Sequence, residues 1–198
     1  QGESGAPSQA QAGQALANYE WSELKQAKWD ARRALLDCAL GAPLSAFFHA
    51  ADFEFYIVKN EVVPKTYYFG LVGGRDYQPK PAFYAAQTLC TLLAGELAVD
   101  PATPTLTSTE APPDEHRAHR FTTARGPLLA WWQAHDMMQP FTPTAATLTA
   151  SPALREPVVV EPISQAVYRP EPAGDGSWRV PLVDWPLLMV ERSAVELS

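Results

Sequence analysis

Proline is the sequence feature that most restricts what this chain can fold into. The 198 residues include 19 prolines, about twice the usual share of roughly 5%. Because proline lacks a backbone N–H and interrupts the interiors of helices and sheets, this abundance favours loops, short strands and sheet edges over a helical bundle. With 46% hydrophobic and 11% aromatic residues, the chain can still bury one sizeable core or two small ones.

The charge of the chain is acidic, with 22 acidic and 15 basic side chains and a formal net charge of -7. Nucleic acids and anionic membranes bind clustered lysine and arginine, so neither is an expected partner. No apolar run approaches the ~18 residues that a membrane helix needs, and no stretch resembles a signal peptide. Residue 1 is Gln and the first methionine is Met137, so we expect a processed protein or a piece of a longer one.

Two helices are predicted in the first half of the chain. Ser22 is a suitable N-cap for a helix over residues 22–40, whose apolar positions step mostly by three and four. A second helix is predicted over residues 81–94, starting at a proline whose missing N–H costs nothing in the first turn. Between them, the apolar and aromatic run Leu44–His49 predicts a buried strand, followed by a loop to residue 66. This order of elements is typical of parallel βα units.

The pattern changes in the second half of the chain. Residues 99–114 are rich in Pro, Thr and Asp and are interpreted as a joint between domains, which divides the chain into residues 1–98 and residues 99–198. Beyond the joint, short extended runs alternate with turn residues, and seven runs at this spacing predict an antiparallel β-sandwich. The runs are Arg120–Ala124, Leu128–His135, Ala145–Ala150, Pro157–Glu161, Ala166–Arg169, Trp178–Val183 and Pro186–Glu191.

The two cysteines, Cys38 and Cys90, each fall in one of the predicted helices. They could form a disulfide if the helices lie side by side and the protein meets an oxidising compartment. The simpler interpretation is a pair of buried thiols that act as small apolar residues. We favour the second interpretation, because two cysteines say little about the compartment.

The opening residues Gly2-Glu3-Ser4-Gly5 allow two interpretations. In the nucleophile elbow G-x-S-x-G of serine hydrolases, Ser4 would be the nucleophile, but the second glycine comes one place early and no helix follows. Alternatively, Glu3 is a carboxylate at the C-terminal end of a barrel strand, on the face where (β/α)8 enzymes place catalysis. From position alone, Glu3 is more simply a polar residue near a chain end.

Four segments, taken in order, resemble the C-terminal part of a known enzyme family. They are Trp21–Trp29 with Arg32-Arg33, Leu44–Phe53, Phe69–Val72 and Pro79–Ala85. Their order and spacing look like the end of the clan A glycoside hydrolases, which are (β/α)8-barrel enzymes that often carry a β-sandwich after the last helix. The segments Pro157–Val160 and Val180–Pro186 are similar to that accessory sheet domain.

The resemblance implies a fold and a reaction. Residues 1–3 match the end of barrel strand seven, residues 22–40 helix seven, residues 44–49 strand eight and residues 81–94 helix eight. The implied fold class is α/β followed by all-β: the last two βα units of a (β/α)8 barrel and then a C-terminal antiparallel β-sandwich. Clan A enzymes are retaining and use two carboxyl groups about 5–5.5 Å apart. Their nucleophile matches Glu3. Their acid/base residue would lie upstream, so this chain alone is expected to be inactive.

The resemblance also implies residues that bind the sugar. Phe47, Phe48 and His49 would end strand eight, where family members present an aromatic platform, often a Trp. Asp52 would bind a sugar hydroxyl or simply cap a loop. Trp21 would line the rim of the cleft or staple the start of the helix. The expected partner is an oligo- or polysaccharide, no cofactor is expected, and the family favours a secreted or periplasmic location.

No metal site is expected from the sequence. Glu115, His116 and His119 form the only local cluster of ligating residues, and on a strand, positions three apart point to opposite faces. We therefore interpret the two histidines as a solvated pair.

The alternative to an enzyme is a non-catalytic module, a β-sandwich that binds carbohydrate or holds domains together. Two or three coplanar exposed aromatic rings on its outer face would favour carbohydrate binding, whereas apolar residues facing residues 81–94 would favour a structural role. The pair Trp131-Trp132 on a strand places one ring in the core and one outward. The outward ring is either a sugar-binding platform or packed against the barrel, and we favour the packing role.

Overall fold

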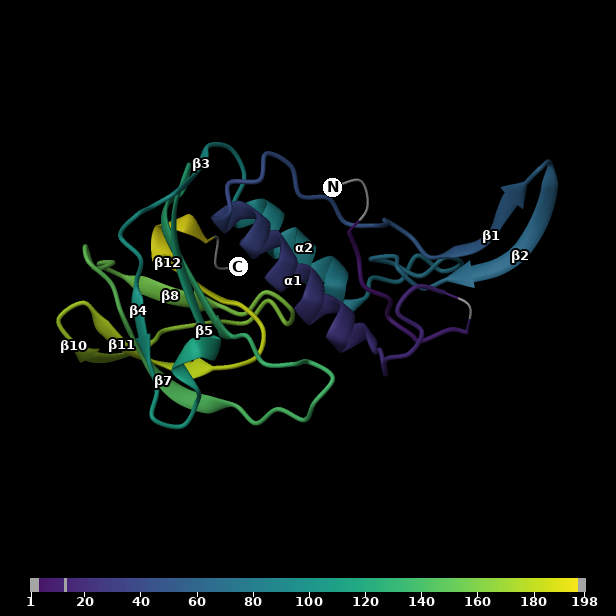
Figure 1. Cartoon of the computed structure of the whole chain (residues 1–198). Coiled ribbons are helices and arrows are strands. Elements are labelled where there is room, and N and C mark those ends of the chain that lie inside the picture. The colour runs from purple at the N-terminus through teal and green to yellow at the C-terminus, as the bar shows by residue number, and fades with distance from the viewer. Residues whose placement is uncertain (1–3, 13, 196–198) are drawn as a thin grey trace.

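The computed structural model describes residues 4–12 and 14–195. In this part of the chain, two helices and mostly antiparallel strands form three layers, and a β-hairpin extends from one end (Figure 1). The helices are α1 (Glu23–Ala39) and α2 (Pro81–Leu92), with short 3-10 turns at Pro113–Glu115 and Arg192–Ala194. The strands are β1 (Phe53–Val58), β2 (Glu61–Tyr67), β3 (Leu97–Val99), β4 (Thr105–Thr107), β5 (His116–Thr123), β6 (Gly126–Gln133), β7 (Thr144–Thr149), β8 (Pro157–Val160), β9 (Val167–Tyr168), β10 (Glu171–Gly174), β11 (Ser177–Leu182) and β12 (Leu187–Glu191).

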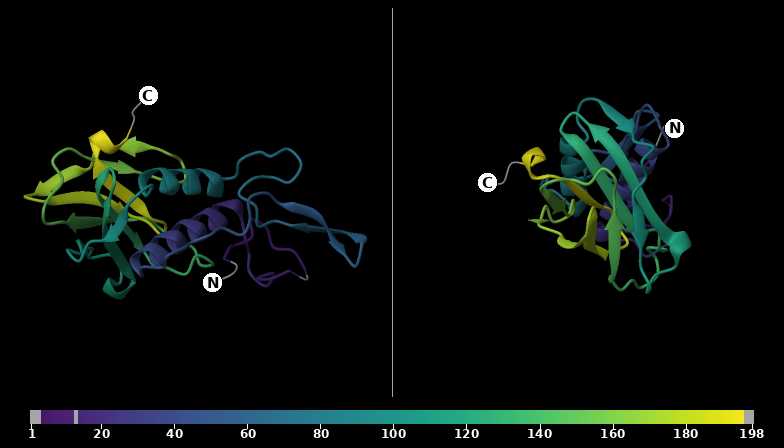
Figure 2. Two further views of the ribbon diagram at one scale, coloured as in Figure 1. Left: turned by 90° about the horizontal axis from the view of Figure 1, so that it is seen from above. Right: turned by 90° about the vertical axis from the view of Figure 1, so that its left-hand side faces the viewer.

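Both predicted helices are confirmed, and they lie side by side between the hairpin and the sandwich (Figure 2). At the start of α1, the hydroxyl of Ser22 accepts a hydrogen bond from the backbone N–H of Lys25 at 3.2 Å. This bond satisfies one of the N–H groups that the first turn of a helix leaves without a partner. The helix ends at Ala39, and Gly41 follows with a φ of +68°, which suits a residue without a side chain.

Replacement of Ser22 by Ala is expected to lower the free energy of unfolding by about 1 kcal/mol, because the N–H of Lys25 loses its acceptor. Urea denaturation of the two proteins measures this difference. Ser22→Asp keeps an acceptor and is expected to restore most of the stability. Equal denaturation midpoints for Ser22→Ala and the parent chain would show that this cap contributes nothing.

Two stacked antiparallel sheets form a β-sandwich after α2 (Figure 1). One sheet has the order β3-β5-β6-β12-β8-β9 and the other the order β10-β11-β7-β4. The core between the sheets contains Trp131, Val159 and Met189 from the first sheet and Leu148 and Leu182 from the second. All five side chains are fully buried. The strands alternate inward and outward residues, which explains why their pattern was visible in the sequence.

The other face of the six-stranded sheet packs on the two helices. Trp132 and Leu188 from the sheet share a core with Leu35 of α1 and Leu89 of α2. Neighbouring residues of β6 therefore enter different cores, since Trp131 lies between the sheets and Trp132 lies under the helices. Each ring is at most 1% exposed. The sequence predicted this division of the two rings.

A buried carboxylate joins α1 to the sandwich. Asp184 follows β11 and is 1% exposed, with its Oδ1 2.7 Å from Lys28 Nζ and its Oδ2 3.6 Å from Arg32. Lys28 Nζ also lies 4.6 Å from the ring centre of Trp185, and Arg32 donates to the carbonyl of His135 at 2.8 Å. Removal of one member of such a buried set would leave the remaining charges without compensation. These contacts fix the sandwich against the helix.

Two predictions for the segment between the helices are wrong. Leu44–His49 forms no strand, and the side chain of Leu44 is 80% exposed. The predicted loop that follows contains the β1–β2 hairpin, whose turn is Lys59-Asn60 with φ of +49° and +68°. Both values are typical of the two-residue type I′ turn of hairpins. Pro64 lies opposite Phe55 where the register shifts, a place where a sheet tolerates proline.

Three further strands lie where the sequence predicted none. β3 and β4 fall in or beside the predicted joint, and β10 precedes the turn at Gly174. All three are at the edges of their sheets, and most of their residues are exposed. A short exposed edge strand needs no alternation of apolar and polar residues, so the sequence carries no signal for it.

Both cysteines are free thiols. Cys38 is half-buried, and burial raises its pKa. Cys90 is exposed, so the expectation of two buried thiols is wrong for this residue. Within the described residues, neither α1 nor α2 has the length and apolar character that a membrane span requires.

Candidate functional site

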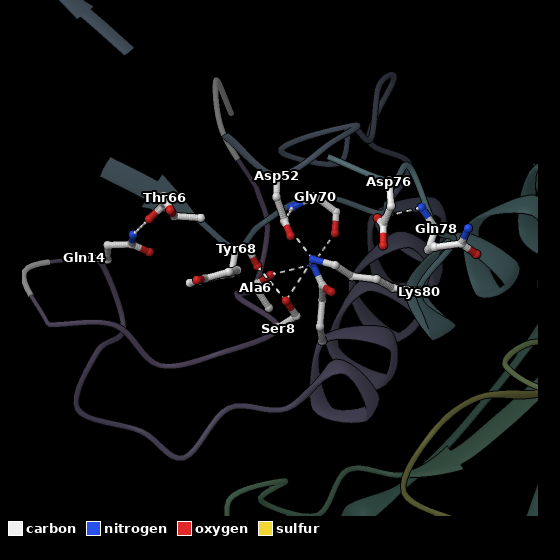
Figure 3. Close-up of polar contacts among 11 residues, drawn as sticks. Ala6, Ser8, Gln14, Asp52, Thr66, Tyr68, Gly70, Asp76, Gln78 and Lys80 are labelled. Carbon is white, nitrogen blue, oxygen red and sulfur yellow. Dashed lines mark hydrogen bonds and ion pairs between the residues drawn. The ribbon is translucent and has the colours of Figure 1, made fainter. Parts of the chain in front are cut away.

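Three segments that are distant in the sequence lie side by side near the base of the hairpin (Figure 3). They are residues 4–8, 48–52 and 68–72. The backbone N–H of Phe48 donates to the carbonyl of Ser4 at 2.8 Å, which joins the first segment to the second. The first segment also contacts the third, because the backbone N–H of Ser8 donates to the carbonyl of Tyr68 at 2.7 Å.

The second and third segments pair in parallel. The N–H of His49 donates to the carbonyl of Phe69, and the carbonyl of His49 accepts from the N–H of Leu71, each at 3.1 Å. Ala51 and Val72 form a parallel bridge. Within the wrongly predicted strand at 44–49, Phe48 and His49 make these backbone hydrogen bonds, whereas Leu44 at its start is exposed.

Glycines allow these segments to approach one another closely. A Cβ atom on Gly5 would lie 2.1 Å from the carbonyl oxygen of Phe48, and one on Gly70 would lie 2.2 Å from the amide nitrogen of Asp52. Any larger residue would push the backbones apart. Gly5 in the opening motif is thus required by packing against the second segment.

Lys80 ties all three segments to the start of α2 (Figure 3). Its amine lies 2.7 Å from Asp52 Oδ1 and donates to the hydroxyl of Ser8 at 2.9 Å. Ser8 in turn donates to the carbonyl of Tyr68 at 3.1 Å, and the N–H of Gly70 donates to Asp52 Oδ1 at 2.8 Å. The side chains of Lys80 and Asp52 are only 6% and 9% exposed. This buried ion pair stabilises the geometry of the site.

Aromatic rings cover the second segment. The ring of His49 stacks on Phe53 at 3.9 Å with an interplanar angle of 9°, and Phe48 meets it edge-on at 4.6 Å. Burial lowers the pKa of His49, which favours the neutral imidazole. Its two ring nitrogens and the hydroxyl of Ser4 are buried and make no hydrogen bond of normal geometry with the described residues.

The structure brings together some of the predicted site residues and separates others. Phe48, His49 and Asp52 lie in the second segment, although the carboxylate of Asp52 is used by Lys80 and Gly70. Phe47 packs against the core under the helices instead. The indole N–H of Trp21 donates to the carbonyl of Leu16 at 3.1 Å and holds the turn before α1. Glu3 lies outside the described residues, one position before Ser4.

Sequence reasoning missed four polar residues of this site: Ser8, Gln26, Asp30 and Lys80. All four are buried. Gln26 and Asp30 lie within the apolar face of α1, next to Ala27 and Ala31, and a polar pair four residues apart on such a face was an available signal. Lys80 stood in a Pro-Lys-Pro stretch that was recognised only as part of the family pattern. Its partner, Asp52, cannot be identified without the fold.

The histidines of the second half are placed apart from this site. The Nδ1 of His116 lies 3.2 Å from the carbonyl of Leu106, and the ring of His119 lies 5.4 Å from that of Trp132. Both histidines are half-buried, so the expectation of a solvated pair is wrong. Across residues 4–12 and 14–195, no group of three or more His, Cys, Asp or Glu side chains could hold a metal ion.

Comparison with known proteins identifies the fold and no closer relationship. No family model matches the sequence, and no curated protein is similar to it. One similar solved structure is a family 39 glycoside hydrolase from the gut symbiont Bacteroides cellulosilyticus WH2, with a TM-score of 0.60 and 16% sequence identity. The match covers 86% of this chain and 31% of that chain. The chain therefore has a glycoside hydrolase-like fold and spans about a third of the length of that enzyme.

Proposed function

We propose that this chain is the C-terminal part of a retaining glycoside hydrolase. The observation that carries the proposal is the structural match to a family 39 glycoside hydrolase over 86% of the chain. In this proposal, residues 1–98 supply the last two βα units of a (β/α)8 barrel. Residues 99–198 form the accessory sandwich, and the remaining barrel strands precede this chain.

The proposed reaction uses two carboxyl groups. Glu3 attacks the anomeric carbon of an oligo- or polysaccharide, while an upstream carboxylic acid protonates the leaving oxygen. The same upstream group then acts as a base, and water hydrolyses the covalent glycosyl intermediate with net retention. The placement of the residue after Glu3 supports this role, because the carbonyl of Ser4 accepts a hydrogen bond from Phe48, one of the residues proposed to contact the sugar. Phe48 and His49 would contact the sugar from the second segment.

The complete enzyme is expected to hydrolyse an aryl glycoside with retention of configuration, whereas the 198-residue chain alone is expected to be inactive. Proton NMR of the first-formed anomer measures the stereochemistry before the product mutarotates. The isolated chain, tested at the same concentration, is the control. Inversion, or turnover by the isolated chain, would contradict the two-carboxylate proposal.

The second candidate function is a non-catalytic module, which would either bind carbohydrate or hold domains together. One face of the six-stranded sheet is covered by α1 and α2, with Trp132 buried beneath them. Among the large apolar side chains that are exposed on the described part of the sandwich, Tyr168 is the only aromatic one. A single ring is not a flat platform of two or three, so these observations favour a structural role of the sandwich over carbohydrate binding.

A further inference from the structure

Helix α1 contacts the backbone of one residue of the first segment. The side-chain amide of Gln26 donates to the carbonyl of Ala6 at 3.1 Å. One turn further along the helix, the carboxyl group of Asp30 lies near the N–H of Ala6, which lowers the pKa of that carboxyl group. Gln26 and Ala6 are completely buried, and Asp30 is 3% exposed. We call Gln26 and Asp30 the Ala6 clamp.

Two oxygen atoms of the Ala6 clamp have no donor. They are Oε1 of Gln26 and Oδ1 of Asp30, both buried and without a hydrogen-bond partner among the described residues. The orientation of the Gln26 amide is determined, because its nitrogen also donates to the carbonyl of Gly70 at 3.2 Å. A flipped amide would turn its oxygen towards two carbonyl oxygens. Residues four apart on a helix are neighbours, so a single hydrogen atom between Gln26 and Asp30 is a way to satisfy both acceptors.

The surroundings disfavour a negative charge on Asp30. Burial raises the pKa of Asp30 to about 8, while the N–H of Ala6 and the positive charge of Lys80 oppose this rise. Lys80, at the start of α2, is the charged group that acts on Asp30. The charge of Lys80 is already balanced by Asp52, which precedes β1, and its amine also donates to Ser8. The ion pair therefore leaves Asp30 without a dedicated countercharge.

We propose that Asp30 is protonated in the folded protein at neutral pH and is a positioning residue for the first segment. Its O–H donates to Oε1 of Gln26, and its other oxygen accepts from the N–H of Ala6. One proton thereby satisfies both unpaired oxygens and fixes the backbone three residues after Glu3. The protonated pair stands independently of the reaction, whereas the consequence for catalysis rests on the proposed function.

The pH dependence of stability tests the protonated pair on this chain. Because the pKa of Asp30 is higher in the folded state than its ordinary value of 3.8, the unfolded chain loses this proton first. Asp30 therefore makes the free energy of unfolding decline from about pH 4 to about pH 8, and this contribution levels off above that range. Asp30→Asn keeps a donor for Gln26 and an acceptor for Ala6 but has no proton to lose.

We expect Asp30→Asn to abolish this part of the decline in the free energy of unfolding. Urea denaturation at a series of pH values measures it. The matched control is Asp37→Asn on the same helix, where the carboxylate accepts from Arg33 and Ser45, and it should retain the decline. If Asp30→Asn instead shows the same decline as the parent chain from about pH 4 to about pH 8, Asp30 is ionised in the folded state and the proposal is wrong.

A second measurement does not depend on the folding of a variant. Infrared spectra of the parent chain at about pH 7 should contain the C=O band of a protonated carboxylic acid, since exposed carboxyl groups are ionised there. The band should disappear above about pH 8. A spectrum without the band at neutral pH would overturn the proposal.

Activity of the complete enzyme then tests the positioning role. The kcat/KM of the parent enzyme should fall roughly tenfold between about pH 8 and about pH 9 as Asp30 loses its proton, and Asp30→Asn should remove this loss. An identical alkaline loss in both enzymes would overturn the positioning role. An enzyme without glycosidase activity would refute the proposed function, while the stability and infrared results would still decide the protonated pair.

Discussion

In the complete enzyme, Glu3→Gln is expected to lower turnover of an aryl glycoside by roughly 10⁴-fold or more, the scale on which loss of a nucleophile acts. An amide cannot form the covalent glycosyl intermediate, so the step that defines a retaining enzyme is lost. The fold should be unaffected, because the segment that follows Glu3 is held by its own contacts, from Phe48 to Ser4 and from Lys80 to Ser8. Initial rates of aryl release, with a thermal denaturation curve for each protein, measure both effects.

Two substitutions control this experiment. Glu20→Gln makes the same chemical change at an exposed residue before α1 and should leave the rate unchanged. Ser4→Ala separates the two interpretations of the opening motif, since a serine nucleophile would make this variant the inactive one. Full activity of Glu3→Gln would remove Glu3 from the reaction, whatever the fold.

The elements that the sequence predicts well are those with a buried face and a local end signal. The α1 helix begins at Ser22, whose hydroxyl caps it, and its buried face recurs through Ala27, Ala31 and Leu35. The central strands of the sandwich alternate between two cores, as Trp131 and Trp132 illustrate. In both cases a local pattern is enough, because the period of the apolar residues alone indicates which face of the element is buried.

The hairpin and the site depend on information that is not local. On the β1–β2 hairpin, the apolar residues Phe55 and Ile57 are 58% and 67% exposed, so these two positions carry no signal of burial. The Lys80–Asp52 ion pair joins residues 28 positions apart, with the whole hairpin between them in the sequence. A buried charge pair has no sequence pattern of its own, since either residue alone is typical of a surface.

Replacement of Lys80 by Met is expected to lower the free energy of unfolding by about 3–5 kcal/mol, the usual effect of removing one member of a buried ion pair. Asp52 would keep a charge at 9% side-chain exposure with no cation beside it. The Arg75–Glu54 pair is the matched control, because its side chains are 85% and 32% exposed. Arg75→Met should cost much less stability than Lys80→Met, because solvent screens an exposed pair. Urea denaturation of the three proteins gives both differences.

A double variant shows whether the stability lost in Lys80→Met comes from the unpaired charge on Asp52. In the Lys80→Met background, Asp52→Asn removes the charge while its side-chain oxygen still accepts from the N–H of Gly70, so part of the lost stability should return. Hydrogen exchange should show the N–H of Ser8, which donates to Tyr68, exchanging faster in Lys80→Met, since the lysine holds the hydroxyl of the same residue. A loss as small as that of Arg75→Met would mean that backbone pairing alone holds the three segments together.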